Sequence, residues 1–577
     1  MKNIQSRSIP EDGRAFSGER LHPLLRRIYA ARQASDSDLE SGLANLHSPD
    51  LLKGLPAAID LLVAALQQQQ RILIVGDFDA DGATSSALAV AALRELGALH
   101  VDYLVPDRFR FGYGLTPEIV DVALTRNPDL LITVDNGISS IDGVERARAA
   151  GVRVLVTDHH LPGKQLPAAD AIINPNQPDD DFPSGALAGV GVAFYLMMAL
   201  RSRLRASSWF EQQGIKEPNL AAYLDLVALG TVADVVPLDS NNRLLVRQGL
   251  SRIRAGHCRP GIRALLKVAG RNPSRVVASD FGFAAGPRLN AAGRLDDMSV
   301  GIECLLAESE QRAEELAQQL DALNRERREI EAGMKADAMR HLDEMKLEAD
   351  DLPAGFCLYD AGWHQGVIGI LASRIKEQFH RPVIVFAASG EGELKGSARS
   401  ISGLHIRDVL DAVASRHPGL LSKFGGHAMA AGLSLEASQL DSFRQAFLAE
   451  LERQLDTETL TGVLETDGEL QPEDFSLEMS ELLRDAGPWG QGFPEPLFDG
   501  VFSVRATRIV GEHHLKLSLQ SGDGGPVVSA IAFGQVERYV PVEGELVRVV
   551  YRLDTNEYRG TLSLQLVTEW IEAWHAR

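Results

Sequence analysis

Residues 71–96 read RILIVGDFDADGATSSALAVAALREL, and this stretch is the best single guide to the architecture of the N-terminal half of the chain. The apolar run Ile72 to Val75 is too short for a helix and predicts a strand buried on both faces of a parallel sheet. Acids at alternate positions follow it, and an alanine-rich helix follows them. In open α/β sheets, ligands bind beyond the carboxyl ends of such strands. The stretch therefore predicts a ligand site at this edge of a sheet.

Two later apolar runs end in the same way. Residues 130–134 lead into Asp135, and residues 152–156 lead into Asp158, His159 and His160. Since the carboxyl ends of parallel strands meet at one edge, we expect all three acidic clusters to converge on one crevice.

A crevice that holds so many acids predicts a metal site. Two unit charges about 4 Å apart repel by roughly 4 kcal/mol at an effective dielectric constant of 20, so the carboxylates stay ionised together only with cations among them. Oxygen ligands favour Mg²⁺ or Mn²⁺ over zinc, and one histidine shifts the preference toward Mn²⁺. For the first cluster alone, an acidic turn that caps a helix is the alternative interpretation.

Length and composition indicate a multidomain globular protein. A chain of 577 residues exceeds the size at which single cores stop growing. Its apolar runs are shorter than a membrane span and its first twenty residues are polar, so we expect a cytoplasmic protein with no membrane contact. Cys258, Cys304 and Cys357 are far apart, which predicts buried thiols rather than a zinc ribbon or disulfides.

The charge distribution is uneven. A formal net charge of -21 argues against a protein that coats nucleic acid by bulk electrostatics. Between Asp239 and Asp280, however, the sequence contains no acid and many arginines. Such a segment could guide a polyanion to one place, or it could simply cover a solvated helix face, and the sequence leaves both interpretations open.

The pattern changes along the chain. Strand and helix signals alternate from residue 71 to about 158. A long charged segment with apolar residues at helical spacing covers residues 307–347, and a second α/β pattern covers residues 356–451. Five short strands over residues 498–567 predict a β-barrel of the oligonucleotide-binding type. The predicted limits are 1–55 for an N-terminal segment, 56–305 for the first α/β domain, 306–349 for a connecting helix, 350–460 for the second α/β domain and 461–577 for the barrel domain.

Several motifs occur in a characteristic order. They are Asp79-Ala80-Asp81-Gly82, Val134-Asp135-Asn136-Gly137, Asp158-His159-His160, GTVADVV at 230–236, GPRLNAAGR at 286–294, KGSARS at 395–400 and Gly425-Gly426-His427. From about residue 56 to its end, the chain resembles the DHH phosphoesterase superfamily. Its later motifs resemble one branch, the bacterial single-strand-specific 5′-to-3′ DNA exonucleases. This resemblance implies a DHH domain with a mainly parallel sheet, a DHHA1-type domain joined to it by a long helix, and an OB-like barrel.

The resemblance also implies roles for individual residues. It implies two ions, Mg²⁺ or Mn²⁺, with Asp135 bridging them, Asp77 as a ligand or its neighbour, and His160 orienting the phosphate or a ligand. The implied metal ligands are Asp77, Asp79, Asp81, Asp135, His159 and Asp234, and the implied catalytic residues are Asp79, Asp81, Asp135, His159, His160 and Asp234. The implied phosphate- and substrate-binding residues are Arg108, Arg288, Asn290, Arg294, Ser397, Arg399 and His427.

The implied activity is two-metal hydrolysis of single-stranded DNA from its 5′ end to mononucleotides, in DNA repair and recombination. A single-strand-binding protein and a RecQ-type helicase are the implied partners of a monomer. Tyr551, Tyr558 and Phe533 could stack on bases in the barrel, or could fill its core. Two other functions remain: a phosphoesterase for small substrates such as pyrophosphate or cyclic dinucleotides, and a non-catalytic replication scaffold.

Overall fold

The structure is a computed structural model that describes most of the chain, namely residues 3–9, 21–40, 42–107, 110–344, 352–390, 392–456, 459–522, 524–558 and 560–574. Its contacts divide the chain into two compact units. The larger unit is Ser6–Asp321 with Glu465–Arg577, and the smaller unit is Met1–Gln5 with Ala322–Leu464. Within the described residues, every helix is too short or too polar to span a lipid bilayer.

The larger unit contains the parallel sheet that the sequence predicts. Its strand order is β3-β2-β4-β5-β6, and every neighbouring pair is parallel. The central strands are short runs of Leu, Ile and Val that are buried along their whole length. The strands are β2 (Ile72–Val75), β3 (Val101–Leu104), β4 (Leu130–Val134), β5 (Arg153–Thr157) and β6 (Ala171–Ile173).

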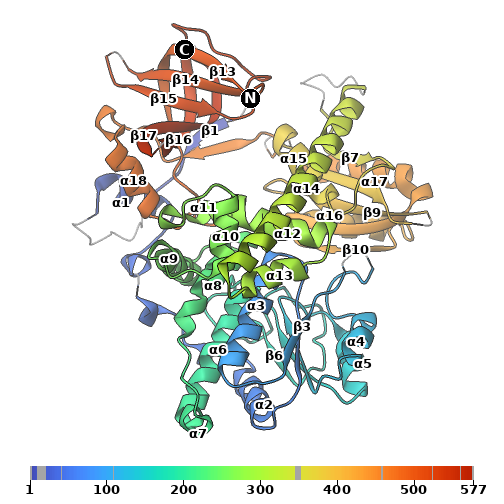
Figure 1. Cartoon of the computed structure of the whole chain (residues 1–577). Coiled ribbons are helices and arrows are strands. Elements are labelled where there is room, and N and C mark those ends of the chain that lie inside the picture. Colours follow the sequence, from blue (N-terminus) through green and yellow to red (C-terminus); the bar gives the residue numbers. More distant parts are fainter. Residues whose placement is uncertain are drawn as a thin grey trace. The chain divides into compact units, whose positions relative to one another are not determined.

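Helices cover both faces of this sheet. Figure 1 shows α4 and α5 on one face, where they share a hydrophobic cluster with β2 and β4, and α2, α3 and α6 on the other. Small side chains let helices approach α3 closely: a Cβ built at Gly230 would lie 2.2 Å from Thr84 Oγ1. The five helices are α2 (Leu55–Gln67), α3 (Ala80–Glu95), α4 (Pro117–Leu124), α5 (Ile141–Ala149) and α6 (Gly189–Ala206).

Further helices extend this α/β domain. α1 (Pro23–Ala31) precedes the sheet and is followed by three short 3₁₀ turns, η1 (Asp36–Leu39), η2 (Leu43–Asn45) and η3 (Pro49–Leu51). The helices after the sheet are α7 (Trp209–Gln213), α8 (Leu224–Ala233), α9 (Ser240–Arg254), α10 (Pro260–Val268), α11 (Ala278–Asp280), α12 (Gly286–Leu295) and α13 (Ser299–Leu306). A π-helical turn, η6 (Phe281–Ala285), joins α11 to α12.

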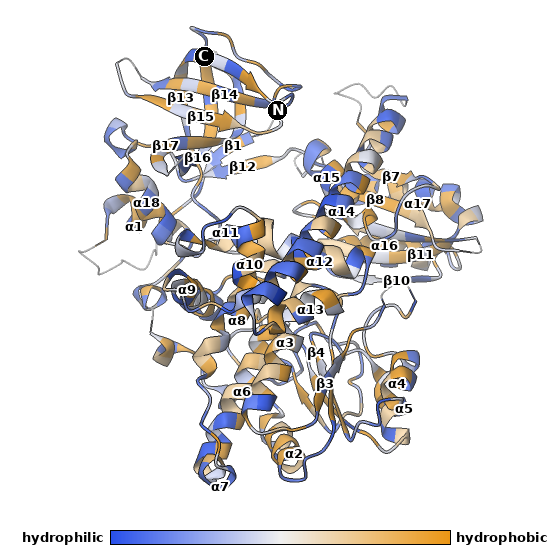
Figure 2. Cartoon of the chain, viewed as in Figure 1, coloured by the Kyte–Doolittle hydropathy of each residue, from blue (hydrophilic) through white to orange (hydrophobic). Residues whose placement is uncertain are grey.

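The long charged helix is present as α14 (Glu310–Glu344), and Figure 2 shows how much of its surface is hydrophilic. The boundary between the two units falls inside it, after Asp321. Leu316 and Leu320 are buried before that point, and Met334 and Leu342 are buried after it in a core of the smaller unit. The apolar residues of α14 are thus buried in the larger unit before the boundary and in the smaller unit after it.

The smaller unit is a second α/β fold with a mixed sheet of order β10-β11-β9-β8-β7. β7 and β8 are parallel, and the other neighbours are antiparallel. The strands are β7 (Phe356–Tyr359), β8 (Val383–Ala388), β9 (Glu393–Arg399), β10 (Lys423–Gly426) and β11 (Ala430–Glu436). Its helices are α15 (Ile368–Phe379), α16 (Ile406–Arg416) and α17 (Leu440–Gln454).

The end of the chain forms a closed five-stranded barrel, as its alternating pattern predicts. The strand order is β13-β14-β15-β17-β16, from β13 (Phe498–Val510), β14 (His514–Ser521), β15 (Val527–Ala532), β16 (Leu546–Tyr558) and β17 (Thr561–Ala573). Helix α18 (Leu477–Asp485) precedes it, and β1 (Asn3–Ser6) pairs with β12 (Val463–Thr466) in a separate two-stranded sheet. The predicted domain limits stay predictions.

Candidate metal centre

The first acids lie in the loop between β2 and α3. Asp79 is the N-cap of α3, where its Oδ1 accepts hydrogen bonds from the backbone N–H groups of Asp81 at 3.0 Å and Gly82 at 2.9 Å. Asp77 Oδ1 accepts a hydrogen bond from the N–H of Phe78 at 2.8 Å. These backbone bonds hold the carboxylates at the carboxyl end of β2 before any ligand arrives.

Asp81 is buried in the first turn of α3 and faces the N-terminus of α6. Its two carboxylate oxygens accept hydrogen bonds from the N–H of Gly189 at 2.6 Å and of Val190 at 2.9 Å. Burial, and next the charge of Asp79, raise the pKa of Asp81 to about 7. The α6 N-terminus therefore offsets only part of the cost of burying this acid.

Asp135 follows β4 and is buried in a left-handed backbone conformation with φ of 61°. Only a few per cent of non-glycine residues adopt positive φ, and such strain gathers at functional sites. Its side chain packs directly against the first residue of α6: a Cβ built at Gly189 would lie 2.6 Å from the Cβ of Asp135. Burial, and next the charges of Asp81 and Asp79, raise the pKa of Asp135 well above its usual range.

His159 joins the cluster from the end of β5. Its Nε2 lies 3.1 Å from Asp135 Oδ1 and 3.5 Å from Asp234 Oδ2. Burial lowers the pKa of His159 to about 4, so its imidazole is neutral near pH 7. A neutral imidazole is the form that binds a metal.

His160 points to different partners. Its Nδ1 lies 2.8 Å from Asp158 Oδ1, and the other oxygen of Asp158 accepts a hydrogen bond from the N–H of Ile138 at 2.9 Å. Burial disfavours its charged form, yet the hydrogen bond and charge of Asp158 outweigh burial and raise the pKa of His160. The Tyr113 hydroxyl lies 3.2 Å from the same ring. His160 thus lies beside the acids, its ring is held by Asp158 and Tyr113, and its raised pKa favours the protonated form.

Asp234 completes the cluster as the C-cap residue of α8. Burial, and next the charges of Asp81 and Asp79, raise its pKa well above the usual range. The next residue, Val235, has φ of 62°. A β-branched residue in this region is a true conformational outlier, so a second strained backbone position borders the cluster.

The donor set fits divalent cations. Three overlapping groups have ligand atoms within 4.8 Å of one another: Asp77, Asp79 and Asp135; Asp81, His159 and Asp234; and Asp135, His159 and His160. Asp135 Oδ1 and His159 Nε2 are buried and lie 3.1 Å apart, yet neither atom makes a well-formed hydrogen bond among the described residues. Leaving such atoms unsatisfied costs about 1–3 kcal/mol each. Bound cations would remove this cost and the repulsion between the acids.

Gly189 is a site residue that sequence reasoning missed. In sequence, Gly189-Val190-Gly191 resembles a fragment of a dinucleotide-binding fingerprint. No sequence pattern connects it with an acid about a hundred positions earlier. In the structure its N–H binds Asp81, and its missing side chain leaves room for Asp135. Tyr113 was missed as well, because nothing near it in sequence signals a catalytic role.

We expect Gly189→Ala to lower turnover about 100-fold, the scale of loss that follows a displacement of about 1 Å at a reacting centre. The new Cβ would lie 2.7 Å from Asp135 Oδ1, so the Asp135 carboxylate must move. Turnover and DNA affinity should be measured separately, and affinity should change little.

Gly333→Ala is the matched control, because a Cβ at Gly333 in α14 meets no atom within 4 Å. It should leave activity unchanged. A Gly189→Ala enzyme within threefold of the wild-type turnover would contradict the steric argument.

Two predicted substrate-binding residues of α12, Arg288 and Asn290, make hydrogen bonds within the protein. Arg288 is buried and its Nε donates to Asp321 Oδ1 at 2.9 Å. Asn290 Oδ1 accepts a hydrogen bond from the N–H of Ala80 at 2.8 Å. α12 therefore braces the acidic loop, and a direct contact of either residue with substrate stays a prediction.

Ser397 and Arg399 lie together on β9 in the smaller unit. Arg399 Nη1 donates to Ser397 Oγ at 3.0 Å, and both side chains face the first turn of α15, where a Cβ at Gly369 would lie 2.8 Å from Arg399 Nη2. Burial lowers the pKa of Arg399. In the part of the chain that the structure describes, its hydrogen bonds go to Ser397 Oγ and to the carbonyl of Ala398, and none goes to a carboxylate. A half-buried arginine, a hydroxyl and a helix N-terminus form a cradle suited to an anion.

The remaining predicted phosphate residues are placed as follows. Arg294 is half-buried in the last turn of α12. His427 is exposed directly after β10. Arg108 lies outside the described residues. Their contacts with a phosphate stay predictions.

The acid-free arginine segment is not an open basic stripe. Among the described residues, seven of its nine cations form ion pairs, six of them with acids that the fold brings from elsewhere in the larger unit and one with Asp280 at the end of the segment. The pairs are Arg243 with Asp38, Arg254 with Asp485, Arg259 with Asp225, Arg263 with Glu310, Lys267 with Glu314, Arg271 with Asp280 and Arg275 with Glu481. The segment therefore serves chiefly to join parts of this unit.

The barrel aromatics differ in exposure. Tyr551 is 1% exposed and packs against Phe498 and Phe502, so it fills the core. Phe533, at the end of β15, is 58% exposed. The side chain of Tyr558 lies outside the described residues. Stacking on a base thus stays a prediction for Phe533 and is excluded for Tyr551.

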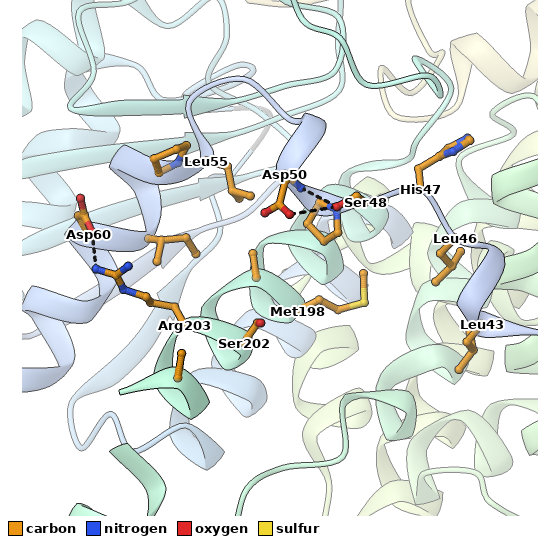
Figure 3. A pocket seen from close by; sticks show the side chains of 15 residues that line it. Leu43, Leu46, His47, Ser48, Asp50, Leu55, Asp60, Met198, Ser202 and Arg203 are labelled. Carbon is orange, nitrogen blue, oxygen red and sulfur yellow. Dashed lines mark hydrogen bonds and ion pairs between the residues drawn. The ribbon is translucent and has the colours of Figure 1, made fainter. Parts of the chain in front are cut away.

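A cavity of about 660 Å³ lies away from these acids, between residues 43–60 and the later turns of α6. Figure 3 shows Leu43, Leu46, Leu55 and Met198 in its wall, with the ion pair of Asp60 and Arg203 at one end. None of the predicted site residues lines it.

Comparisons with known proteins agree with the whole arrangement. Three family models match the chain: the DHH family, N-terminal domain, over residues 71–231; the DHHA1 domain over residues 353–453; and the RecJ OB domain over residues 466–569. The first match contains every predicted metal ligand except Asp234.

Two curated relatives are similar over nearly their whole length. Both are named single-stranded-DNA-specific exonuclease RecJ. The protein from Dickeya dadantii is 57% identical, with 95% of this chain and 96% of that protein covered, and the one from Escherichia coli is 55% identical, with 98% and 99% covered.

Solved structures show the same likeness. The crystal structure of RecJ from Thermus thermophilus in complex with Mn²⁺ matches with a TM-score of 0.80 and 31% identity, over all of this chain and 80% of that one. The complex of that organism's RecJ with Mg²⁺ matches with a TM-score of 0.75 and 29% identity, over all of this chain and 79% of that one. With its fold, its acidic cluster and these relatives in agreement, the chain belongs to the RecJ family.

Proposed function

We propose that this protein is a divalent-metal-dependent exonuclease that hydrolyses single-stranded DNA from its 5′ end to mononucleotides, in DNA repair and recombination. The observation that carries the proposal is the buried cluster in which Asp135 Oδ1 and His159 Nε2 make no well-formed hydrogen bond among the described residues. The names of the relatives support the choice of single-stranded DNA, and the titles of the solved structures support Mn²⁺ or Mg²⁺.

The residues of the cluster divide the work. Asp77, Asp79, Asp81, Asp135, His159 and Asp234 would hold two cations, with Asp135 between them. When bound, the cations supply Lewis acidity and lower the pKa of a water molecule. His160, whose charged form Asp158 favours, is placed to donate a hydrogen bond to a phosphate oxygen, and Tyr113 contacts its ring. The strained backbone at Asp135 keeps its carboxylate aimed at the cluster without rearrangement.

A single digestion assay tests this function. Strands labelled at the 5′ or 3′ end, single or double, are incubated with Mg²⁺, Mn²⁺ or chelator. We expect mononucleotides from the 5′ end of single strands, and no reaction with chelator. Hydrolysis of dinucleotides or pyrophosphate alone would favour a small-substrate phosphoesterase, and no hydrolysis with either metal would favour a scaffold.

We further propose that the cradle of Ser397 and Arg399 holds the terminal 5′-phosphate. Arg399→Ala should lower the preference for 5′-phosphorylated over 5′-hydroxyl ends about tenfold, since a charge-assisted hydrogen bond contributes about 1.5–3 kcal/mol. The measurement is the ratio of kcat/KM on the two ends. Arg399→Lys should restore part of the preference, because the charge returns without the bidentate fork.

Arg407→Ala is a suitable control, since Arg407 is exposed in the same unit on α16. An Arg399→Ala enzyme whose ratio of rates equals that of wild type would remove Arg399 from the pocket. Arg108 remains proposed as a further contact of the terminal 5′-phosphate, and His427 as a phosphate contact of the second α/β domain. Arg288 and Arg294 remain proposed along the strand path, and Asn290 as a substrate-binding residue.

The cellular setting is also a proposal. Since its relatives are named for an action on DNA, we propose that the protein works in the cytoplasm as a monomer, with a single-strand-binding protein and a RecQ-type helicase as partners. Co-purification with either partner from cells, and light scattering of the pure protein, would test this.

A further inference from the structure

Phe283 is an aromatic side chain that the fold displays to solvent. It is 76% exposed, the largest exposed fraction among the exposed large hydrophobic residues described, and it lies in the π-helical turn η6. Phe281, two residues earlier in the same turn, is fully buried and anchors the turn in the core. π-helical turns are rare and are frequently found at functional sites. Exposing so large an apolar side chain on an anchored turn calls for a functional reason.

The turn packs directly beside the metal centre. A Cβ at Gly282 would lie 3.7 Å from Val232 Cγ1, and one at Gly286 would lie 3.0 Å from the Cβ of Ala233. These two residues of α8 immediately precede Asp234. Figure 1 shows α8, α11 and α12 as neighbours.

The same helical run is tied to the acidic loop at its other end. Asn290, seven residues after Phe283, accepts the hydrogen bond from Ala80 at the start of α3. Seven residues of helix span about 10 Å. Phe283 is therefore held at a short, rigid distance from the acids by contacts with both α8 and α3.

A second apolar side chain borders this surface. Val235 follows Asp234, is 62% exposed, and has the unfavourable φ of 62° already described. A strained β-branched residue that also exposes its side chain gains nothing in stability from either feature. Phe283 and Val235 are thus two exposed apolar side chains on adjoining segments, one on the turn that packs against the end of α8 and one directly after Asp234.

We propose that Phe283 is a base-stacking residue for the nucleotide next to the scissile phosphate, with Val235 packing against the same nucleotide; this deepens the proposed function and rests on it. Every base has a flat face, so stacking on an aromatic ring holds a strand without regard to sequence. A duplex keeps its bases stacked on one another and offers this ring no free face. Phe283 therefore contributes to the choice of single strands and to the register of cleavage.

Strands that lack one base test the proposal. Each substrate carries a single abasic site at one of the first six positions from the 5′ end. For the wild-type enzyme, we expect kcat/KM to fall about tenfold at one or two neighbouring positions, which corresponds to about 1.4 kcal/mol. Phe283→Ala should lose about tenfold on the intact strand and lose nothing further at those positions, while Phe283→Trp should keep the wild-type profile.

Two controls separate stacking from general damage. Leu99→Ala removes another side chain of similar exposure, 74%, from a distant turn and should keep the wild-type profile. Phe283→Ala should keep the wild-type melting temperature, because the side chain that it removes is exposed and contributes little to the core.

An abasic profile that is the same in Phe283→Ala and wild type would overturn the stacking role while leaving the exonuclease intact. A wild-type enzyme that fails to degrade the unmodified strand would instead overturn the proposed function itself, so the two failures are distinguishable.

Discussion

Asp135→Ala is expected to abolish hydrolysis, with turnover reduced at least about 1,000-fold, or about 4 kcal/mol in activation free energy. Asp135 lies in two of the three ligand groups and 3.1 Å from His159, so its loss weakens both proposed cation sites at once. The fold should persist, because removing one of several crowded, mutually repelling acids relieves unfavourable charge. Turnover on labelled single strands, melting temperature and DNA affinity are the three measurements.

Asp142→Ala is the matched control, because Asp142 is an exposed acid at the start of α5, the helix that follows β4. It should retain full activity. An Asp135→Ala enzyme that keeps more than about a tenth of the wild-type turnover, less than a 1.4 kcal/mol effect, would show that this residue does not bridge two ions.

Removal of divalent cations is expected to stop hydrolysis completely, and their return should stabilise the protein more at high pH than at low pH. Without cations, burial and neighbouring charges raise the pKa of Asp81 to about 7 and raise those of Asp135 and Asp234 as well. These values lie above the roughly 3.9 of an unfolded chain, so the folded state binds more protons. The contribution of these three acids to stability is therefore fully present below about pH 4 and is lost as pH rises through about 7.

Cations take the place of those protons, so their effect has the opposite trend. Mn²⁺ at about 100 times its dissociation constant contributes about 2.7 kcal/mol, or a rise of about 3 °C in melting temperature for a unit of this size, at pH 8. At about pH 5.5 protons compete for the same carboxylates, and the rise should be less than half as large.

Thermal melting with and without Mn²⁺ at the two pH values measures this difference. The Asp135→Ala protein should lose most of the rise at the higher pH. Equal shifts at both pH values, or full activity after exhaustive treatment with chelator, would contradict a carboxylate-held pair of ions.

Much of the fold was predictable from local patterns. Short buried runs such as Ile72 to Val75 can pair only inside a sheet, and acids that follow such runs must lie at its carboxyl edge. The five barrel strands likewise follow from alternation interrupted by turn residues. For that reason these parallel strands and the barrel were predicted correctly. The acids that were predicted as metal ligands do lie close together.

Other features could not be predicted, because they join residues that are far apart along the chain. Gly189 reaches Asp81 across 108 positions, and Arg288 finds Asp321 only once α14 has packed. The arginines that suggested a basic stripe are paired with acids from Asp38 to Asp485. A pattern in sequence shows which charges are near in the chain, but not which ones are near in space.

The sequence by itself thus determined the kind of site. Strand ends and residue types alone place Asp77, Asp79, Asp81, Asp135 and His159 at one edge of the sheet. Which of their atoms lack a well-formed hydrogen bond, which backbone positions are strained, and where Phe283 points were settled only by long-range packing. Burial and the approach of α6, α8 and α12 set those properties, and both depend on the complete fold.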